Sequence, residues 1–270
     1  MKKLLANLIF SNLYVSLAAG LISAGINSFL HYPFSIEIGL FIFSSTLSIY
    51  SFQRLVKYKL EEKRESELNT WIEKNQIIQI IYISLSSLLS IYLYFFILKA
   101  FDNTKWWMII SFLLSVMYAV KMKGVSLRDI PYIKIHLIAI VWCKALFFPI
   151  VLQNDYTTSN LAFITSHYFF FIALCIPFDI RDLNYDNLKL RTLPQLIGVS
   201  NSRFLSMFSM LIFGFLCCLV YPSLKQNSFF LIGVLSSIFT LSFSNVNRNS
   251  FYYGILVDGL IILIGLSYFL

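Results

Sequence analysis

Apolar runs of about 20 residues recur from one end of this chain to the other, and they constrain its fold more than any other feature. A helix needs roughly 20 largely apolar residues to cross the hydrocarbon core of a membrane. With 58% hydrophobic and 13% charged residues, the 270-residue chain is far more apolar than an ordinary soluble domain. Its longest hydrophilic stretch, from Arg54 to about Gln76, is too short and too charged to bury a core of its own. We therefore expect a single all-α integral membrane domain over residues 1–270.

The apolar runs predict nine transmembrane helices. The predicted spans are residues 4–25, 34–53, 77–98, 105–121, 131–152, 159–178, 204–221, 228–244 and 251–270. The segments predicted to face the cytoplasm are about 54–76, 121–131, 179–203 and 245–250. Lys2 and Lys3 could instead open a secretory signal with a cleavage site near residues 18–20. Because the apolar run continues past these residues, we expect a retained first span.

The loops between the predicted spans alternate between neutral and basic, which is the pattern that sets orientation by the positive-inside rule. With a cytoplasmic N-terminus, sixteen of the 21 basic residues lie in cytoplasmic segments and three on the opposite face, while Lys134 and Lys144 fall within the fifth span. A basic rim facing anionic lipid accounts for the net charge of +8 without a nucleic-acid partner. The composition and the lack of an organelle signal favour a bacterial inner membrane.

Three of the 13 acidic residues stand together directly after the sixth predicted span, within segment 178–186. In a continued helix, Asp179, Asp182 and Asp186 would project within one arc of about 60°. Carboxylates held that close repel unless a cation sits among them, and their oxygens suit Mg²⁺, which commonly links one or two carboxylates to a substrate phosphate. An ordinary charge cluster at a solvated helix end is the alternative. The crowding in a chain this poor in acids favours a site for Mg²⁺ and a diphosphate.

The pattern Asp179-x-x-Asp182-x-x-x-Asp186, followed by Arg191-Thr192-Leu193-Pro194 and Gly198, resembles the second aspartate-rich motif of the UbiA superfamily of intramembrane prenyltransferases. Segments 118–123 and 128–132 are also similar to family segments. The resemblance implies a UbiA-like bundle of nine helices. It also implies transfer of a prenyl group from an isoprenoid diphosphate to a lipophilic, possibly aromatic acceptor. The first family motif is expected near the end of the second span, but segment 50–59 contains no carboxylate.

The resemblance also implies roles for particular residues. Asp179, Asp182 and Asp186 are expected to be the catalytic residues and to hold one Mg²⁺, which would stabilise the leaving diphosphate. The candidate contacts for the diphosphate are Arg54, Lys57, Lys123, Arg181, Lys189 and Arg191. Arg54 and Lys57 lie one helical turn apart, so they could hold phosphate directly where the first motif lacks its carboxylates.

Charged residues inside the predicted spans are functional candidates, because a charge in hydrocarbon costs several kcal/mol unless it is paired or faces a cavity. Lys144 and Asp258 are the intramembrane candidates. In the structural alternative, Gly254 and Gly259 allow close helix packing, and Asp258 pairs with a partner such as Lys144. Lys134 lies near the cytoplasmic end of its span and could extend its ammonium group to the surface.

Three functions remain open at this point. The first is the prenyltransferase that the second motif indicates. The second is a non-catalytic protein of the same fold that binds a lipid or a partner membrane protein, which the empty first motif favours. The third is a small-solute transporter, which is disfavoured because no pair of repeats or broken spans is evident. The four cysteines fall in apolar runs without paired metal spacing, so we expect them to be small buried hydrophobic residues.

Overall fold

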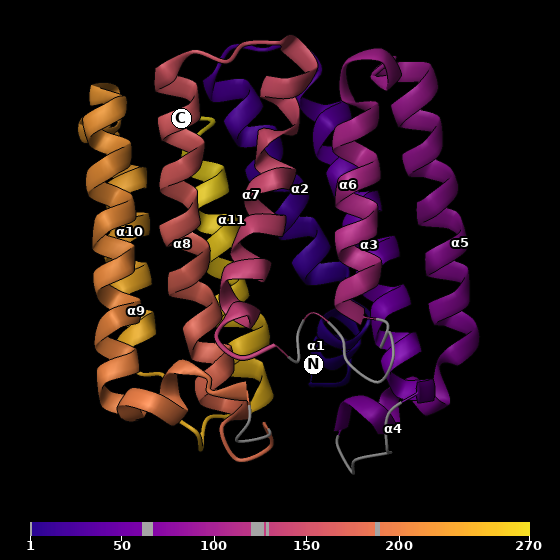
Figure 1. Ribbon diagram of the computed structural model, residues 1–270, viewed down its shortest axis with the longest axis vertical. Coiled ribbons are helices and arrows are strands. Elements are labelled where there is room, and N and C mark those ends of the chain that lie inside the picture. The colour runs from indigo at the N-terminus through magenta and orange to yellow at the C-terminus, as the bar shows by residue number, and fades with distance from the viewer. Residues whose placement is uncertain (1, 61–66, 120–126, 128–129, 187–189) are drawn as a thin grey trace.

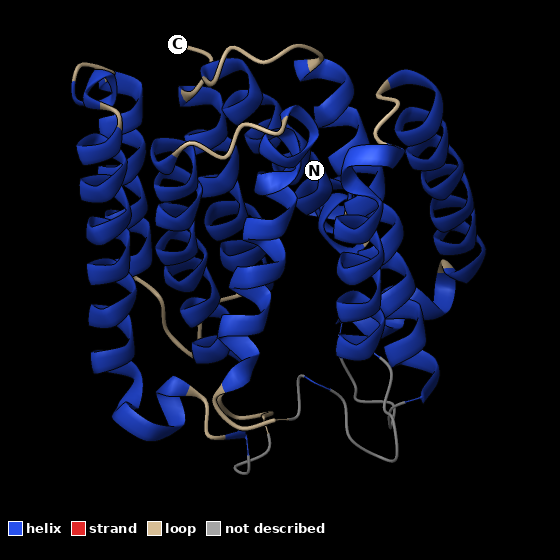
Figure 2. Cartoon of the chain, turned by 45° about the horizontal axis from the view of Figure 1, so that its top comes forward, coloured by secondary structure: helices blue, strands red, loops and turns tan. Residues whose placement is uncertain are grey.

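The computed structural model describes residues 2–60, 67–119, 127, 130–186 and 190–270, and its regular elements in these ranges are helices that run side by side in a bundle (Figure 1). The α-helices are α1 (Lys2–Phe10), α2 (Leu13–Phe29), α3 (Ser35–Leu60), α4 (Glu67–Lys74), α5 (Gln76–Tyr92), α6 (Phe101–Ala119), α7 (Ile133–Gln153), α8 (Thr158–Asp182), α9 (Leu193–Val220), α10 (Ser228–Ser242) and α11 (Asp258–Ser267). Short π-helices, η1 (Leu93–Ile97) and η5 (Tyr252–Val257), and a 3-10 helix, η4 (Pro222–Lys225), are also present. Figure 2 shows the described part of the chain as helices joined by loops and turns.

Five helical segments are long and apolar enough to cross a membrane by length and composition, which indicates a membrane protein. They are Ser35–Lys59, Gln76–Ile97, Ile133–Gln153, Thr158–Asp182 and Leu193–Val220. Three further apolar helices, Leu13–Phe29, Ser228–Ser242 and Tyr252–Ser267, are shorter. The all-helical fold class is thus confirmed for the described part of the chain. The prediction of nine spans in a UbiA-like bundle stays a prediction.

The predicted first span, residues 4–25, is divided between two helices. α1 ends at Phe10 and α2 begins at Leu13, because Asn12 adopts the left-handed conformation with a φ of 66°. The guanidinium of Arg54 on α3 donates hydrogen bonds to the carbonyl oxygens of Ile9 and Phe10, at 3.3 and 2.5 Å. These bonds satisfy carbonyls at the end of α1 that lack a partner within the helix. Arg54 therefore has a structural role at the interruption between α1 and α2.

The predicted cytoplasmic segment 179–203 is partly helical, because α8 extends to Asp182 and α9 already begins at Leu193. The start of α9 is stabilised by Gln195, whose Oε1 accepts a hydrogen bond from the backbone N–H of Thr192 at 2.9 Å. Such a bond satisfies one of the free donors at a helix N-terminus. Gly198, with a φ of 79°, introduces a kink, after which α9 continues to Val220.

Helix α8 packs against α7 and α9, and α2 packs against α3 and α11. The contact between α2 and α11 is close, since a Cβ added to Gly25 would lie 2.2 Å from the carbonyl oxygen of Gly265. Small residues permit such an approach of two helix backbones. His167 is buried in an aromatic core, where its ring nitrogens bond the Phe163 carbonyl at 2.8 Å and the Tyr268 hydroxyl at 2.9 Å. Three of the cysteines, at 143, 175 and 217, are buried as predicted.

The two ends of the bundle differ in their polar residues. At the end where α2 and α7 terminate, the Tyr32 hydroxyl donates to Asp155 Oδ2 at 2.6 Å and accepts from Asn160 Nδ2 at 2.9 Å. Burial and this bond to Asp155 raise the pKa of Tyr32 above its ordinary value. The opposite end, where α3 and α8 terminate and α7 begins, carries Arg54, Lys57, Lys134 and Arg181. We call it the basic end.

Candidate functional site

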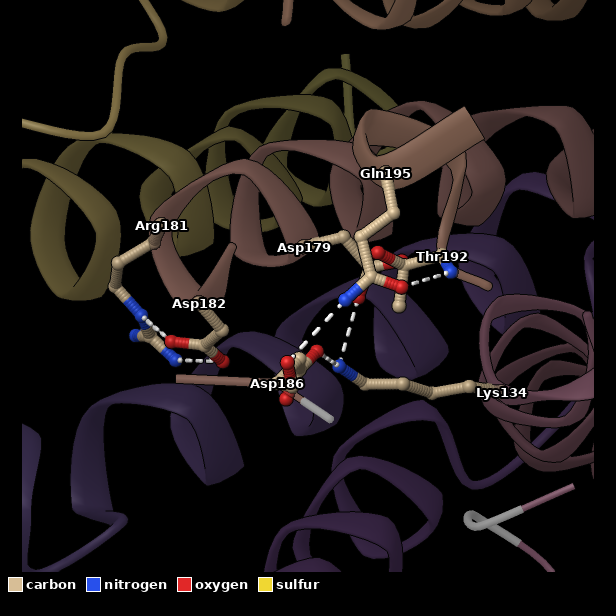
Figure 3. A network of polar contacts seen from close by, with 7 residues as sticks. All are labelled: Lys134, Asp179, Arg181, Asp182, Asp186, Thr192 and Gln195. Carbon is tan, nitrogen blue, oxygen red and sulfur yellow. Dashed lines mark hydrogen bonds and ion pairs between the residues drawn. The ribbon is translucent and has the colours of Figure 1, made fainter. Parts of the chain in front are cut away.

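The acidic cluster of the basic end is formed where α8 terminates. The helix ends at Asp182, whose carbonyl oxygen accepts hydrogen bonds from the backbone N–H groups of Tyr185 and Asp186, both at 2.8 Å. The expected helical continuation through Asp186 is therefore wrong. This turn nevertheless brings Asp186 back beside Asp179. The side chain of Gln195 fixes the turn, since its Nε2 donates to the carbonyl oxygen of Asp186 at 3.3 Å (Figure 3).

Lys134, the second residue of α7, lies between the carboxylates of Asp179 and Asp186 and pairs with both. Its ammonium nitrogen lies 2.8 Å from Asp179 Oδ1 and 2.8 Å from Asp186 Oδ2 (Figure 3). The side chains are 15%, 3% and 11% exposed for Lys134, Asp179 and Asp186. The prediction that Lys134 could extend its ammonium group to the surface is therefore wrong. It is a shared counter-ion in a largely buried cluster.

Asp182 has a different partner from the other two aspartates. Its carboxylate accepts a pair of hydrogen bonds from the guanidinium of Arg181, at 2.7 and 3.0 Å. Arg181 also lies over the rings of Phe178 and Tyr253, at 5.0 and 5.6 Å from their centroids. Paired hydrogen bonds and ring contacts fix the orientation of the guanidinium. The three carboxylates thus form one lysine-bridged pair and one arginine-bound neighbour, and no single cation is shared by all three in the described structure.

Asp258 extends the basic end towards the interior of the bundle. It is the first residue of α11 and directly follows the π-helix η5, a type of irregularity that is frequent at functional sites. Arg181 and Arg54 lie within electrostatic range of its carboxylate. Lys144 has another partner, because its ammonium nitrogen lies 3.7 Å from the centroid of the Trp107 ring. The suggested pairing of Asp258 with Lys144 is therefore not what the structure contains.

The glycines beside Asp258 do serve close packing, as the structural alternative predicted. A Cβ on Gly254 would lie 2.6 Å from a methyl carbon of Ile9, and one on Gly259 would lie 2.8 Å from the Tyr14 hydroxyl. The C-terminal helices therefore rest directly on α1 and α2 at this end.

The remaining predicted phosphate contacts are distributed unevenly. Lys57 is exposed near the end of α3 and lies within electrostatic range of Asp182. Arg191 is also exposed, and its guanidinium donates to the Tyr132 hydroxyl at 2.9 Å. Lys123 and Lys189 lie outside the described residues. The structure thus gathers Arg54, Lys57 and Arg181 with the aspartates and directs Arg191 to the surface beside α7.

The expected Mg²⁺ would need oxygen ligands from Asp179, Asp182 and Asp186. Among the described residues, no group of three or more His, Cys, Asp or Glu side chains is arranged to hold a metal ion. However, Asp179 Oδ2 is buried and has no hydrogen-bond partner in the described structure, and Asp186 converges with Asp179 on one cation position. Two carboxylates suffice where phosphate and water supply the other ligands. Asp179 and Asp186 thus offer two carboxylates to one cation position, which Lys134 fills, and Asp182 is bound by Arg181.

Sequence reasoning noted Lys134 as a charge within a span but did not include it in the site. The position of Lys134 near the end of an apolar span could have indicated its role, because such a lysine either extends its ammonium group to the surface or pairs with a carboxylate. Comparisons of the chain with models of known protein families, with curated proteins and with solved structures find no match. The side chains of the basic end are therefore the main indication of function.

Proposed function

We propose that this chain is a UbiA-like membrane prenyltransferase that binds an isoprenoid diphosphate at the basic end and transfers the prenyl group to a lipophilic acceptor. The observation that carries the proposal is the convergence of Asp179 and Asp186 on one cation position. Arg181 pairs with the neighbouring Asp182, and Arg54 lies within electrostatic range of Arg181. In a chain with only 13% charged residues, charges from α3, α7, α8 and α11 gather at this end, and charged groups in membrane helices are functional candidates by default.

In this proposal Asp179 and Asp186 would hold Mg²⁺, and the bound ion would supply positive charge to stabilise the leaving diphosphate. Lys134 then turns from the carboxylates to the phosphate oxygens, and Arg181 and Lys57 supply further positive charge. Asp182 keeps Arg181 in place and is a positioning residue. The nine-span topology with a cytoplasmic N-terminus, in a bacterial inner membrane, belongs to the same proposal and rests on the distribution of basic residues.

A specific observation also supports a non-catalytic alternative. Lys134 already neutralises the aspartate pair through two ion pairs, and segment 50–59 supplies no carboxylate for a second metal ion. Under this alternative the cluster is a fixed structural element, and the protein binds a lipid or a partner membrane protein without transferring a prenyl group.

The test is thermal stabilisation of the detergent-purified protein by farnesyl or geranylgeranyl diphosphate, with and without Mg²⁺, since a ligand that binds the folded state stabilises it by mass action. We expect a Mg²⁺-dependent shift in the wild type that is lost in Asp186→Asn. Asp182→Ala should reduce the shift. Asp102→Asn is the matched control, because Asp102 is an exposed acid in the first turn of α6. This turn lies beside the end of α7, at the end of the bundle opposite the basic end.

Absence of any shift with either diphosphate would refute the binding site and favour the non-catalytic alternative. A shift that does not depend on Mg²⁺ would mean that lysine and arginine alone hold the phosphates, and it would remove the metal from the proposal. If the Mg²⁺-dependent shift is found, incubation with radiolabelled diphosphate and lipid extract tests for transfer, with Asp186→Asn as the inactive reference.

A further inference from the structure

A second basic site lies between α9, α10 and the segment that leads into η5. A pocket of about 400 Å³ is lined there by Arg203, Ser242, Phe243, Asn245, Asn247 and Arg248. A neighbouring pocket of about 520 Å³ shares Asn247 and Arg248 and continues along η5 to Leu256. The pocket is distinct from the aspartate cluster, and none of the described residues among the candidate diphosphate contacts lines it.

The two arginines approach the pocket from different elements. Arg203 projects from α9, and its Nε is buried with no hydrogen-bond partner in the described part of the chain. Arg248 lies in the connection between α10 and η5. Its Nε donates to the Phe243 carbonyl at 3.1 Å, and its guanidinium lies 5.5 Å from the centroid of the Tyr252 ring. One guanidinium is thus held in a fixed orientation, and the other has a buried donor that needs an acceptor.

These features match the chemistry of a phosphate group. Arginine presents planar donors that bond phosphate oxygens in pairs, and asparagine amides add neutral donors. The six lining residues, all of them described, include two arginines and two asparagines but no carboxylate that would compete with an anion. An anion in the pocket would also supply the acceptor that the buried Nε of Arg203 lacks.

The surroundings of the pocket favour a lipid as the source of the phosphate. Phe239 and Phe243 at the end of α10 and Leu256 on η5 are exposed apolar side chains, and Leu256 and Phe243 line the two pockets themselves. Apolar surface beside arginines at the end of a membrane helix is the environment of a phospholipid headgroup with its chains alongside. We infer that this pocket binds the phosphate of an anionic phospholipid in the leaflet at the basic end.

The inference can be tested with the detergent-purified full chain. Native mass spectrometry and thermal unfolding would measure retention of, and stabilisation by, phosphatidylglycerol, zwitterionic phosphatidylcholine and inorganic phosphate. We expect phosphatidylglycerol to be retained preferentially, and the double variant Arg203→Gln/Arg248→Gln to weaken its binding at least about tenfold, since two charge-assisted contacts are lost. Lys74→Gln is the matched control, because Lys74 is an exposed lysine at the end of α4, outside the pocket.

Asn247→Asp provides a second variant if the arginine changes lower stability by themselves. Asn247 is exposed, so this change places a negative charge at the pocket without disturbing the core, and it should also weaken phosphatidylglycerol binding. Equal binding of phosphatidylglycerol and phosphatidylcholine, or unchanged binding in the double variant and in Asn247→Asp, would overturn the inference. Stabilisation by inorganic phosphate equal to that by phosphatidylglycerol would assign the pocket to a soluble phosphate and overturn the lipid as its source.

Discussion

Replacement of Lys134 by methionine should destabilise the protein strongly. Methionine has a similar length but no charge, so Asp179 and Asp186 would be left facing each other without a counter-ion. Both carboxylates are largely buried, at 3% and 11% exposure, and each lies 2.8 Å from the lysine nitrogen. Removal of one partner from a buried ion pair costs roughly 3–5 kcal/mol, because an uncompensated charge remains.

Loss of the Asp182 charge should lower the free energy of unfolding much less than loss of the Lys134 charge. Arg181 and Asp182 are 38% and 32% exposed, so water screens their attraction. Exposed ion pairs contribute about 0.2–1 kcal/mol, and we expect Asp182→Asn to fall within that range. Lys134→Met should therefore cost several times more than Asp182→Asn, although both changes remove one charge from the same cluster.

The assay is equilibrium unfolding of the purified variants in one detergent, followed by circular dichroism. The triple variant Lys134→Met/Asp179→Asn/Asp186→Asn serves as the control for charge, since replacing a whole buried ionic group is often nearly neutral. It should recover most of the stability that Lys134→Met loses. If Asp179 and Asp186 can hold a divalent cation, Mg²⁺ should also stabilise Lys134→Met more than it stabilises the wild type.

Two results would refute this reasoning. A loss below about 1 kcal/mol in Lys134→Met would mean that the cluster is solvated in the folded protein and behaves as an ordinary surface pair. A triple variant no more stable than Lys134→Met would mean that the lysine contributes through packing of its methylene chain instead of through its charge.

Two further predictions concern other parts of the fold. Gly25→Ala should cost about 2 kcal/mol or more in unfolding measurements, because its Cβ would lie 2.2 Å from the Gly265 carbonyl and the helices must separate. The control Gly214→Ala should cost less, since its new Cβ meets only side-chain atoms. Tyr32→Phe should cost about 1–2 kcal/mol through the lost bond to Asp155. The pKa of Tyr32 is raised, so this bond persists until the pH exceeds that folded-state pKa. A stability difference between Tyr32→Phe and wild type that already shrinks as the pH is raised from 7 to about 10 would contradict this assignment.

The sequence predicted the helical membrane architecture well, because apolar runs of bilayer length leave few alternatives to helices. It also predicted that basic residues and the acidic motif belong to the segments where α3 and α8 end. The helix bounds differ from the predicted spans in two places, since Asn12 divides residues 4–25 between two helices and residues 193–203 already belong to α9. Helix boundaries in these segments depend on single residues and on partners such as Gln195, which periodicity does not reveal.

The spacing of the acidic residues singles them out in the sequence, but their arrangement was decided by the tertiary structure. Local sequence could not show that α8 stops at Asp182, that the following turn returns Asp186 to Asp179, or that α7 delivers Lys134 between them. The hydrophobicity of each segment can be read from its own residues, so apolar runs predict membrane helices without knowledge of the packing. Ion pairing joins segments that are distant in sequence, so only the packed bundle determines which carboxylate meets which cation.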